Sequence, residues 1–176
     1  ERHTQSMRRD SEYRVALVGY TNAGKSTLFK TLTGTNVYIQ DQLFATLDTT
    51  IRKLSLDSSH TILLSDTVGF IRKLPHNLIA SFKSTLKEVL EADLILMVLD
   101  ISSPQINEHM TTIFDVLKEM SANKIPIVKV LNKVDLISNG KLIQKLQQSF
   151  PDSVTISAKN HLRLSDLKQK IMTMME

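Results

Sequence analysis

Short apolar runs alternate with segments of helical periodicity along most of the chain. The runs of strand length are Tyr13–Val18, Ile51–Leu56, His60–Ser65, Leu94–Leu99, Ile125–Leu131 and Val154–Ser157. The run at 94–99 is apolar at every position, which is typical of a strand that is covered on both faces. The second and third runs are separated only by the turn Asp57-Ser58-Ser59, and so short a link permits an antiparallel pair.

Helices are expected between these strands. They are predicted from Lys25 to just before Gly34, from Asn77 to about Glu91, from Ser103-Pro104 onward, over Lys141–Gln148 and over Ser165–Met175. Gly34 suits the C-terminal cap of the first helix, and Ser103 with Pro104 suits the start of the third. Thr35–Thr50 has no clean period and is expected to be a loop. The alternation of strands and helices predicts an α/β fold with a mostly parallel sheet.

Composition limits the functional classes without choosing among them. The 176 residues fit one domain, and 41% hydrophobic with 23% charged residues is ordinary for a globular protein. No apolar run approaches the ~20 residues that cross a bilayer, and the absence of cysteine excludes disulfides and thiolate sites. A cytoplasmic location is therefore expected. The chain begins at Glu1 rather than Met, which is consistent with a piece of a longer protein.

Positive charge is concentrated in one segment. The stretch Thr67–Lys87 contains no acidic residue and contributes +4, which equals the net charge of the whole chain. Its basic residues are Arg72, Lys73, Lys83 and Lys87, with His76 besides. Two interpretations stay open: a solvated helix face beside a loop, or an electrostatic contact for phosphate-rich RNA.

The strongest motif follows the first predicted strand and opens the first predicted helix. Its residues, Gly19, Tyr20, Thr21, Asn22, Ala23, Gly24, Lys25 and Ser26, fit G-x-x-x-x-G-K-S/T. Glycines let the backbone wrap so that successive N–H groups point at a polyphosphate, and the helix dipole favours the same charge. Lys25 is expected to reach the β- and γ-phosphates, and the Ser26 hydroxyl to bind Mg²⁺. The alternative is an ordinary strand–turn–helix joint.

Two further motifs indicate which base is bound. One comprises Asn132, Lys133, Val134 and Asp135, directly after an apolar strand, and the other comprises Ser157, Ala158 and Lys159 at the end of the last strand. Open α/β sheets bind ligands at the carboxyl ends of their strands. The Asp135 carboxylate only accepts hydrogen bonds, so it suits the N1–H and exocyclic amine of guanine and not adenine. The second motif matches the backbone-and-lysine clamp that closes over guanine.

A third motif closes the third predicted strand and is expected at the metal and the terminal phosphate. It comprises Asp66, Thr67, Val68 and Gly69. Asp66 would hold Mg²⁺ through water, and the Gly69 N–H would meet a γ-phosphate. A strand-ending aspartate with a turn glycine is the alternative. Thr46 is the candidate that completes the Mg²⁺ shell, with Thr49 and Thr50 as rivals in the same loop.

With these motifs in place, the chain resembles the HflX family of translation-factor-related GTPases. The match rests on three segments: the phosphate loop extended through Thr27, Leu28 and Phe29; the segment Leu43, Phe44, Ala45, Thr46, Leu47 and Asp48; and the segment from Asp66 to His76. The resemblance implies a Ras-like six-stranded sheet, Mg²⁺-dependent GTP hydrolysis and binding to the large ribosomal subunit in ribosome splitting or rescue. Residues 1–12 resemble the end of a linker from a missing N-terminal domain, and 13–176 a G domain, expected to be monomeric.

The sequence departs from the family in two loops. Asp48-Thr49-Thr50 lacks the proline that is common after the aspartate, so this segment is expected to be looser. Asn160-His161-Leu162-Arg163 stands where a glycine-containing turn is common, which leaves the shape of that loop open. The five histidines (His3, His60, His76, His109 and His161) lack metal-ligand spacing and are expected at the surface.

Many small GTPases carry a water-orienting glutamine after the glycine of the third motif, but this chain has Phe70. We therefore expect slow intrinsic hydrolysis that a partner or an ion accelerates. Asn22 resembles the asparagine that ligates K⁺ in cation-activated G domains, although asparagine also simply favours turns.

Two alternatives remain at the level of function. The serious one is an Obg-like or Era-like ribosome-assembly GTPase. The other is a P-loop kinase, which the Asn132–Asp135 motif and the lack of an obvious arginine-bearing lid disfavour.

Overall fold

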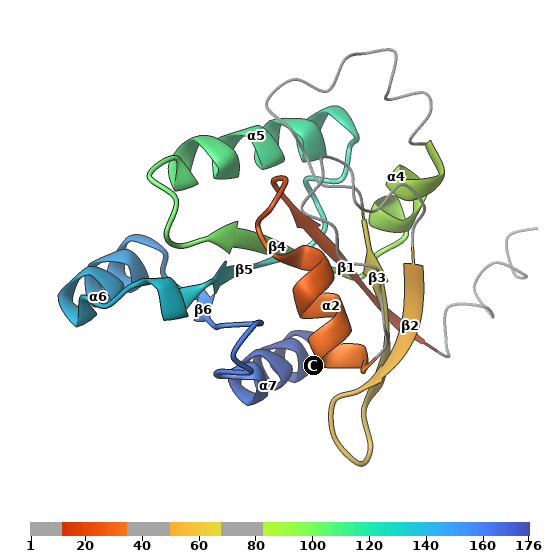
Figure 1. Cartoon of the computed structure of the whole chain (residues 1–176). Helices are drawn as coiled ribbons and strands as arrows, with labels where there is room; N and C mark the ends of the chain where they lie inside the picture. Colours follow the sequence, from red (N-terminus) through yellow and green to blue (C-terminus); the bar gives the residue numbers. More distant parts are fainter. Residues whose placement is uncertain (1–11, 35–49, 68–82) are drawn as a thin grey trace, which may run out of the picture.

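The computed structural model describes residues 12–34, 50–67 and 83–176, which form a six-stranded sheet with helices on both faces (Figure 1). The first half contains β1 (Tyr13–Gly19), α2 (Lys25–Thr33), β2 (Thr50–Ser55), β3 (Thr61–Asp66), α4 (Lys83–Leu90) and β4 (Leu94–Asp100). The second half contains α5 (Ile106–Glu119), β5 (Ile127–Asn132), the 3₁₀-helix η1 (Val134–Leu136), α6 (Gly140–Ser149), β6 (Val154–Thr155) and α7 (Leu164–Met175). None of the helices in these ranges is long and apolar enough to cross a membrane.

The sheet has the strand order β2-β3-β1-β4-β5-β6. β2 pairs antiparallel with β3, and the other neighbours are parallel. The predicted fold class is thereby confirmed, including the antiparallel pair. Because β3 and β4 flank β1 on opposite sides, the connections diverge at the carboxyl end of β1. In open α/β sheets this switch point is where ligands bind, and the glycine-rich loop starts there.

Alternation along the strands builds two separate cores. Val15 and Leu17 of β1 face a cluster that includes α2 and α7. Ala16 and Val18 face the opposite cluster, to which α4, α5 and α6 contribute. All six side chains from Leu94 to Leu99 are buried, as expected for a central strand between two helical layers. The helices thus fix β1 and β4 from both sides, and these strands carry the site.

The predicted start of the third helix is wrong. Ser103 and Pro104 lie before α5, whose N-terminal cap is Gln105 without a side-chain hydrogen bond. The Ser103 hydroxyl instead accepts from the N–H of Gln105 at 3.2 Å, within a turn in which Ile106 N–H donates to the Ser103 carbonyl. The serine therefore stabilises the turn before the helix, which delays the start to Ile106.

Two strand boundaries differ from prediction by two residues, and the other differences are of one residue. β5 begins at Ile127 and not at Ile125, because the Ile125 N–H bonds back to Ala122 in a turn and Pro126 has no N–H to donate. β6 ends at Thr155 because Ser157 turns away to pair with Leu162. The predicted cap at Gly34 is confirmed, since its φ of 69° is left-handed and its N–H donates to the Lys30 carbonyl at 2.8 Å. Residues 77–82 of the predicted second helix lie outside the described ranges.

Of the five histidines, His60 and His161 are exposed, as predicted. His109 is half-buried, and its ring stacks on that of Tyr20, so the expectation that it is simply a surface residue is wrong. The spacing of the histidines along the chain gave no indication of this contact. His3 and His76 lie outside the described residues.

Candidate nucleotide-binding site

Both glycines of the loop after β1 are required by close contacts. A Cβ on Gly19 would lie 2.6 Å from the backbone oxygen of Val98 on β4. Gly24 has a φ of 97°, and a Cβ there would overlap the side-chain amide of Asn132. Gly24 is also the N-cap of α2, and its carbonyl accepts from Leu28 N–H at 2.9 Å. The loop therefore leaves its backbone N–H groups at the positive end of a helix, which suits an anion.

Lys25 is buried in the first turn of α2, with 7% of its surface exposed. Burial lowers the pKa of Lys25 to about 8, and the nearby Asp66 carboxylate opposes this shift. A buried ammonium is unfavourable without an anionic partner. The structure thus holds a positive charge ready for an anion that enters from the loop.

Ser26 and Asp66 meet across α2 and β3. The Ser26 hydroxyl donates to Asp66 Oδ2 at 3.0 Å, and Asp66 is fully buried. Thr67 fixes the end of β3, since its Oγ1 donates to the Leu17 carbonyl at 2.5 Å. A hydroxyl and a carboxylate oxygen are the hard ligands that Mg²⁺ prefers, so the donor set fits the metal predicted for it.

Of the other residues predicted near the metal and the γ-phosphate, one lies in the described ranges. Thr50, a rival for the metal, lies in β2 directly opposite Asp66 in the strand ladder. The others lie outside the described residues: Phe44, Ala45, Thr46, Leu47, Asp48, Thr49, Val68, Gly69 and Phe70.

Asn132 links its own motif to the glycine-rich loop and to the motif Ser157–Lys159. Its side-chain amide donates to the Ala23 carbonyl in the loop after β1 at 3.0 Å. Its Oδ1 accepts from the Ala158 N–H, also at 3.0 Å, and the residue is only 2% exposed. Ala158 is tied further, because its carbonyl accepts from the Thr31 hydroxyl of α2. Asn132 thus has its amide groups engaged with the protein, and its role is to hold the surrounding loops.

Lys133 follows with a left-handed φ of 69°. Its ammonium donates to the Asn22 carbonyl at 2.6 Å and pairs with Asp100 Oδ2 at 2.7 Å. Asp100 was not among the residues predicted for the site. Its position directly after an apolar strand places it on the ligand-binding edge of the sheet, but any aspartate that ends a strand shares this signal.

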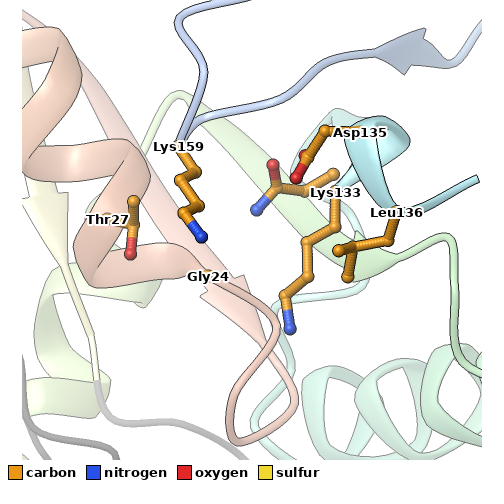
Figure 2. A pocket seen from close by; sticks show the side chains of 7 residues that line it. Gly24, Thr27, Lys133, Asp135, Leu136 and Lys159 are labelled. Carbon is orange, nitrogen blue, oxygen red and sulfur yellow. The ribbon is translucent and has the colours of Figure 1, made fainter.

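A cavity of about 460 Å³ opens between these loops, lined by Gly24, Thr27, Asn132, Lys133, Asp135, Leu136 and Lys159. Figure 2 shows Lys159 and Thr27 on one side and Lys133 with Leu136 on the other. The Asp135 carboxylate, carried by η1, accepts from the buried Ser157 hydroxyl at 2.5 Å. Leu136 is 61% exposed and was missed by the motif search, because a leucine after Asp135 has no chemical signature. The cavity suits a flat ring whose N–H groups meet a carboxylate.

The loop after Lys159 closes without glycine. Ser157 and Leu162 exchange two backbone hydrogen bonds. These bonds define the shape of the loop, which the sequence did not predict. His161 and Arg163 both adopt left-handed backbone, with φ of 56° and 57°. Such a conformation costs an L-residue roughly 1–2 kcal/mol, so the loop contains two strained positions.

Replacing His161 by glycine is expected to stabilise the chain by about 1 kcal/mol, because glycine adopts this φ without the steric cost. For a chain of this size the melting temperature would rise by roughly 2–4 °C, which thermal unfolding followed by circular dichroism measures. His161→Ala is the matched control and should bring no gain, since alanine carries the same Cβ. A gain of equal size with alanine would show that the strain is not the cause.

Comparisons with known proteins agree with this geometry. A family model described as "50S ribosome-binding GTPase" matches residues 14–133. The GTPase HflX of Caldanaerobacter subterraneus subsp. tengcongensis is 48% identical over 157 residues, covering 89% of this chain and 35% of that protein. The chain thus spans about a third of the length of this relative.

Solved structures give the same result. A GTP-binding protein from Sulfolobus solfataricus in complex with GDP has a TM-score of 0.71 and 29% identity, covering 98% of this chain and 55% of that one. Era in complex with MgGDPNP and nucleotides 1506–1542 of 16S ribosomal RNA has a TM-score of 0.73 and 26% identity, covering 92% and 56%. The predicted Ras-like G-domain fold and the resemblance to HflX are both confirmed. The chain belongs to the 50S ribosome-binding GTPase family.

Proposed function

We propose that this chain is the nucleotide-binding part of a longer HflX-like protein, in which it hydrolyses GTP slowly and acts as a nucleotide-dependent switch on the large ribosomal subunit. The observation that carries the proposal is the Asp135 carboxylate, held by Ser157 at the cavity that adjoins the glycine-rich loop. The whole relatives are named GTPase HflX, which supports the enzyme class. On this proposal residues 13–176 are a monomeric G domain, residues 1–12 are the end of a linker, and the protein is cytoplasmic.

The phosphates would lie against the loop from Gly19 to Ser26. Lys25 would pair with the β- and γ-phosphates, and its burial strengthens that attraction by lowering the local dielectric. Ser26 and Asp66 would hold Mg²⁺, which neutralises phosphate charge when bound. Thr46 and the Gly69 N–H are proposed to complete the metal shell and to contact the γ-phosphate. Phosphoryl transfer depends mainly on such positioning and charge neutralisation.

The guanine would enter the cavity beside Asp135, between the side chains of Lys133 and Lys159. Asp135 accepts from the base, and Ser157 holds the carboxylate in place. Val134 and the backbone of Ala158 would complete the base contacts. Asn132 supports this arrangement from behind, through its hydrogen bonds to Ala23 and Ala158.

We propose that Asn22 ligates K⁺ near the phosphates. This cation would substitute for the water-orienting glutamine that the chain lacks, since it has Phe70 at that position. Asn22 has a φ of 63° and an exposed side chain at the tip of the loop. We expect the chain to hydrolyse GTP at less than about 1 s⁻¹. The rate should be higher in KCl than in NaCl, and Asn22→Ala should remove this difference. Phosphate release at equal ionic strength measures this. Equal rates of the parent in the two salts would refute the role of K⁺.

The ribosome role is tested with the longer protein that contains this domain. We expect co-sedimentation with large subunits in the presence of a GTP analogue and weaker co-sedimentation with GDP. The reason is that γ-phosphate contact at Gly69 would present the basic side chains of the stretch Thr67–Lys87 to ribosomal RNA. Arg72→Ala/Lys73→Ala should reduce the binding. Binding that is equal with the GTP analogue and with GDP, and equal in the parent and the variant, would contradict the proposal.

An Era-like role in ribosome assembly is the second candidate, because Era, whose structure contains 16S ribosomal RNA, shares the fold at 26% identity. Binding of the longer protein to assembly precursors, and not to mature large subunits, would favour it.

A further inference from the structure

The outer arm of the phosphate loop, Tyr20–Asn22, is held from outside the loop. Within the loop, the Ala23 N–H donates to the Tyr20 carbonyl at 3.1 Å. Asn22 adopts a left-handed φ of 63°, which asparagine tolerates better than most residues but adopts less often than right-handed backbone. The arm is therefore a place where external contacts decide which conformation persists.

The first external contact is made by α5. The His109 ring stacks on the Tyr20 ring with centroids 3.9 Å apart and planes within 9° of parallel. His109 lies in the first half of α5, and its N–H donates to the Gln105 carbonyl at 2.9 Å. The backbone of His109 is thus part of the helix, and the helix is anchored in the core through Ile113 and Leu117.

The second contact reaches the other end of the arm. Lys133 donates to the Asn22 carbonyl, and Asp100 holds the same ammonium from the opposite side. Asp100 is itself fixed by the turn that leads to α5, since its Oδ1 accepts from the N–H and the hydroxyl of Ser102 at 2.9 and 2.5 Å. Burial alone would raise the pKa of Asp100, but the hydrogen bonds from Lys133 and Ser102 lower it below its ordinary value. Asp100 is therefore ionised at neutral pH.

Both contacts originate in one unit, the end of β4 together with α5. Neither Asp100 nor His109 lines the cavity, so neither is placed to touch the base. Lys133 does line it. The position of this unit consequently determines the conformation of the outer arm and the position of Lys133 in one wall of the cavity.

We propose that Asp100 and His109 are positioning residues that brace the outer arm, so that the placement of α5 determines how long a guanine nucleotide stays bound. This inference rests on the proposed function, because the brace needs a nucleotide to retain. An arm that is free to leave its conformation withdraws backbone donors from the phosphates, and the lifetime of the complex falls. Most affinity changes of this kind affect dissociation rather than association.

Displacement of a fluorescent GDP by excess GDP, in the presence of Mg²⁺, measures this lifetime. His109→Leu is expected to raise the dissociation rate about two- to tenfold, the range given by an aromatic pair. His109→Phe should restore the rate to near that of the parent, because phenylalanine can stack as well. Tyr20→Leu combined with His109→Leu should be no faster than the faster single variant, because both remove one contact.

Asp100→Asn tests the second contact and should raise the dissociation rate by about tenfold, since it removes one charge of the pair with Lys133. The matched control is Phe114→Ala, which alters α5 at a side chain that is 38% exposed and should leave dissociation unchanged. Unfolding midpoints of all variants identify any general loss of stability.

Three outcomes would overturn the brace: unchanged dissociation in His109→Leu and Asp100→Asn, additive effects of Tyr20→Leu and His109→Leu, or an equal acceleration by Phe114→Ala. If these occur while the parent binds GDP, the brace alone is wrong. A parent chain that does not bind GDP at all would overturn the proposed function together with it.

Discussion

Asp135→Asn is expected to lower the affinity for GDP by about a hundredfold or more and to raise that for xanthosine diphosphate. In the proposed binding mode the carboxylate would accept from both N–H groups of the guanine edge, and hydrogen bonds to a charged group contribute roughly 1.5–3 kcal/mol each. Two of them correspond to about two to four decades of affinity.

The direction of the switch follows from the Ser157 contact. Ser157 donates to Asp135 Oδ1, so in the variant it would fix the asparagine oxygen and leave the NH₂ group to face the base. Xanthine carries an oxygen where guanine carries its amine, and that oxygen accepts from an amide. The new base thus fits the reversed polarity of the side chain.

Competition against a fluorescent guanine nucleotide measures both affinities. Asp152→Asn is the matched control: it makes the same change of charge at an exposed position, where a φ of 61° is tolerated by asparagine. The control should bind GDP as the parent does. If Asp135→Asn retained the affinity for GDP, the cavity would not be the guanine site.

Lys25→Met is expected to abolish nucleotide binding and at the same time to stabilise the nucleotide-free chain. The pKa of the buried lysine falls from 10.5 to about 8, and each unit of pKa corresponds to about 1.4 kcal/mol. At neutral pH the charged lysine therefore costs the empty fold about 3 kcal/mol, which methionine avoids with a side chain of similar length. In the proposed function, bound phosphates would offset this cost.

The pH dependence of this effect has a definite sign. The unfolded lysine keeps its proton up to about pH 10.5, whereas the folded one loses it near pH 8. Between these values the unfolded state binds more protons, so the free energy of unfolding of the parent rises with pH. The advantage of the methionine variant is thus largest below pH 8 and disappears above pH 10.5.

Urea unfolding of the nucleotide-free proteins at pH 7 and pH 9.5 tests this. Lys145→Met, an exposed lysine on α6, should change neither stability nor binding. A destabilised Lys25→Met would show that the contact with Asp66 outweighs the burial of the charge.

The sequence was most informative where the chemistry of a residue is specific. Gly19, Lys25 and Asp135 are recognisable because few residue types supply a tight turn, a phosphate-binding cation or an acceptor-only group. The alternation of buried strands and helices likewise predicted the sheet, because each strand has helices to cover it. These signals are local, and they lead directly to the site.

The rest depends on contacts between distant segments. Nothing local distinguishes Asp100 from any aspartate that ends a strand, or His109 from any histidine on a helix. Only the parallel pairing of β4 with β1 and β5 brings them to the loop and to Lys133. The start of α5 shows the same limit at smaller scale, because Ser103 is an equally good partner for a turn and for a helix.

We propose that the cavity between Lys133 and Lys159 accepts guanine while the adjoining loop holds the phosphates. Competition between GDP and ADP for the unaltered chain, with Mg²⁺ present, tests it most directly. Rejection of a ligand that leaves buried polar groups unpaired reaches about four decades, so GDP should displace a fluorescent guanine nucleotide at a concentration at least about a thousandfold lower than ADP. Equal potency of the two nucleotides would contradict the account.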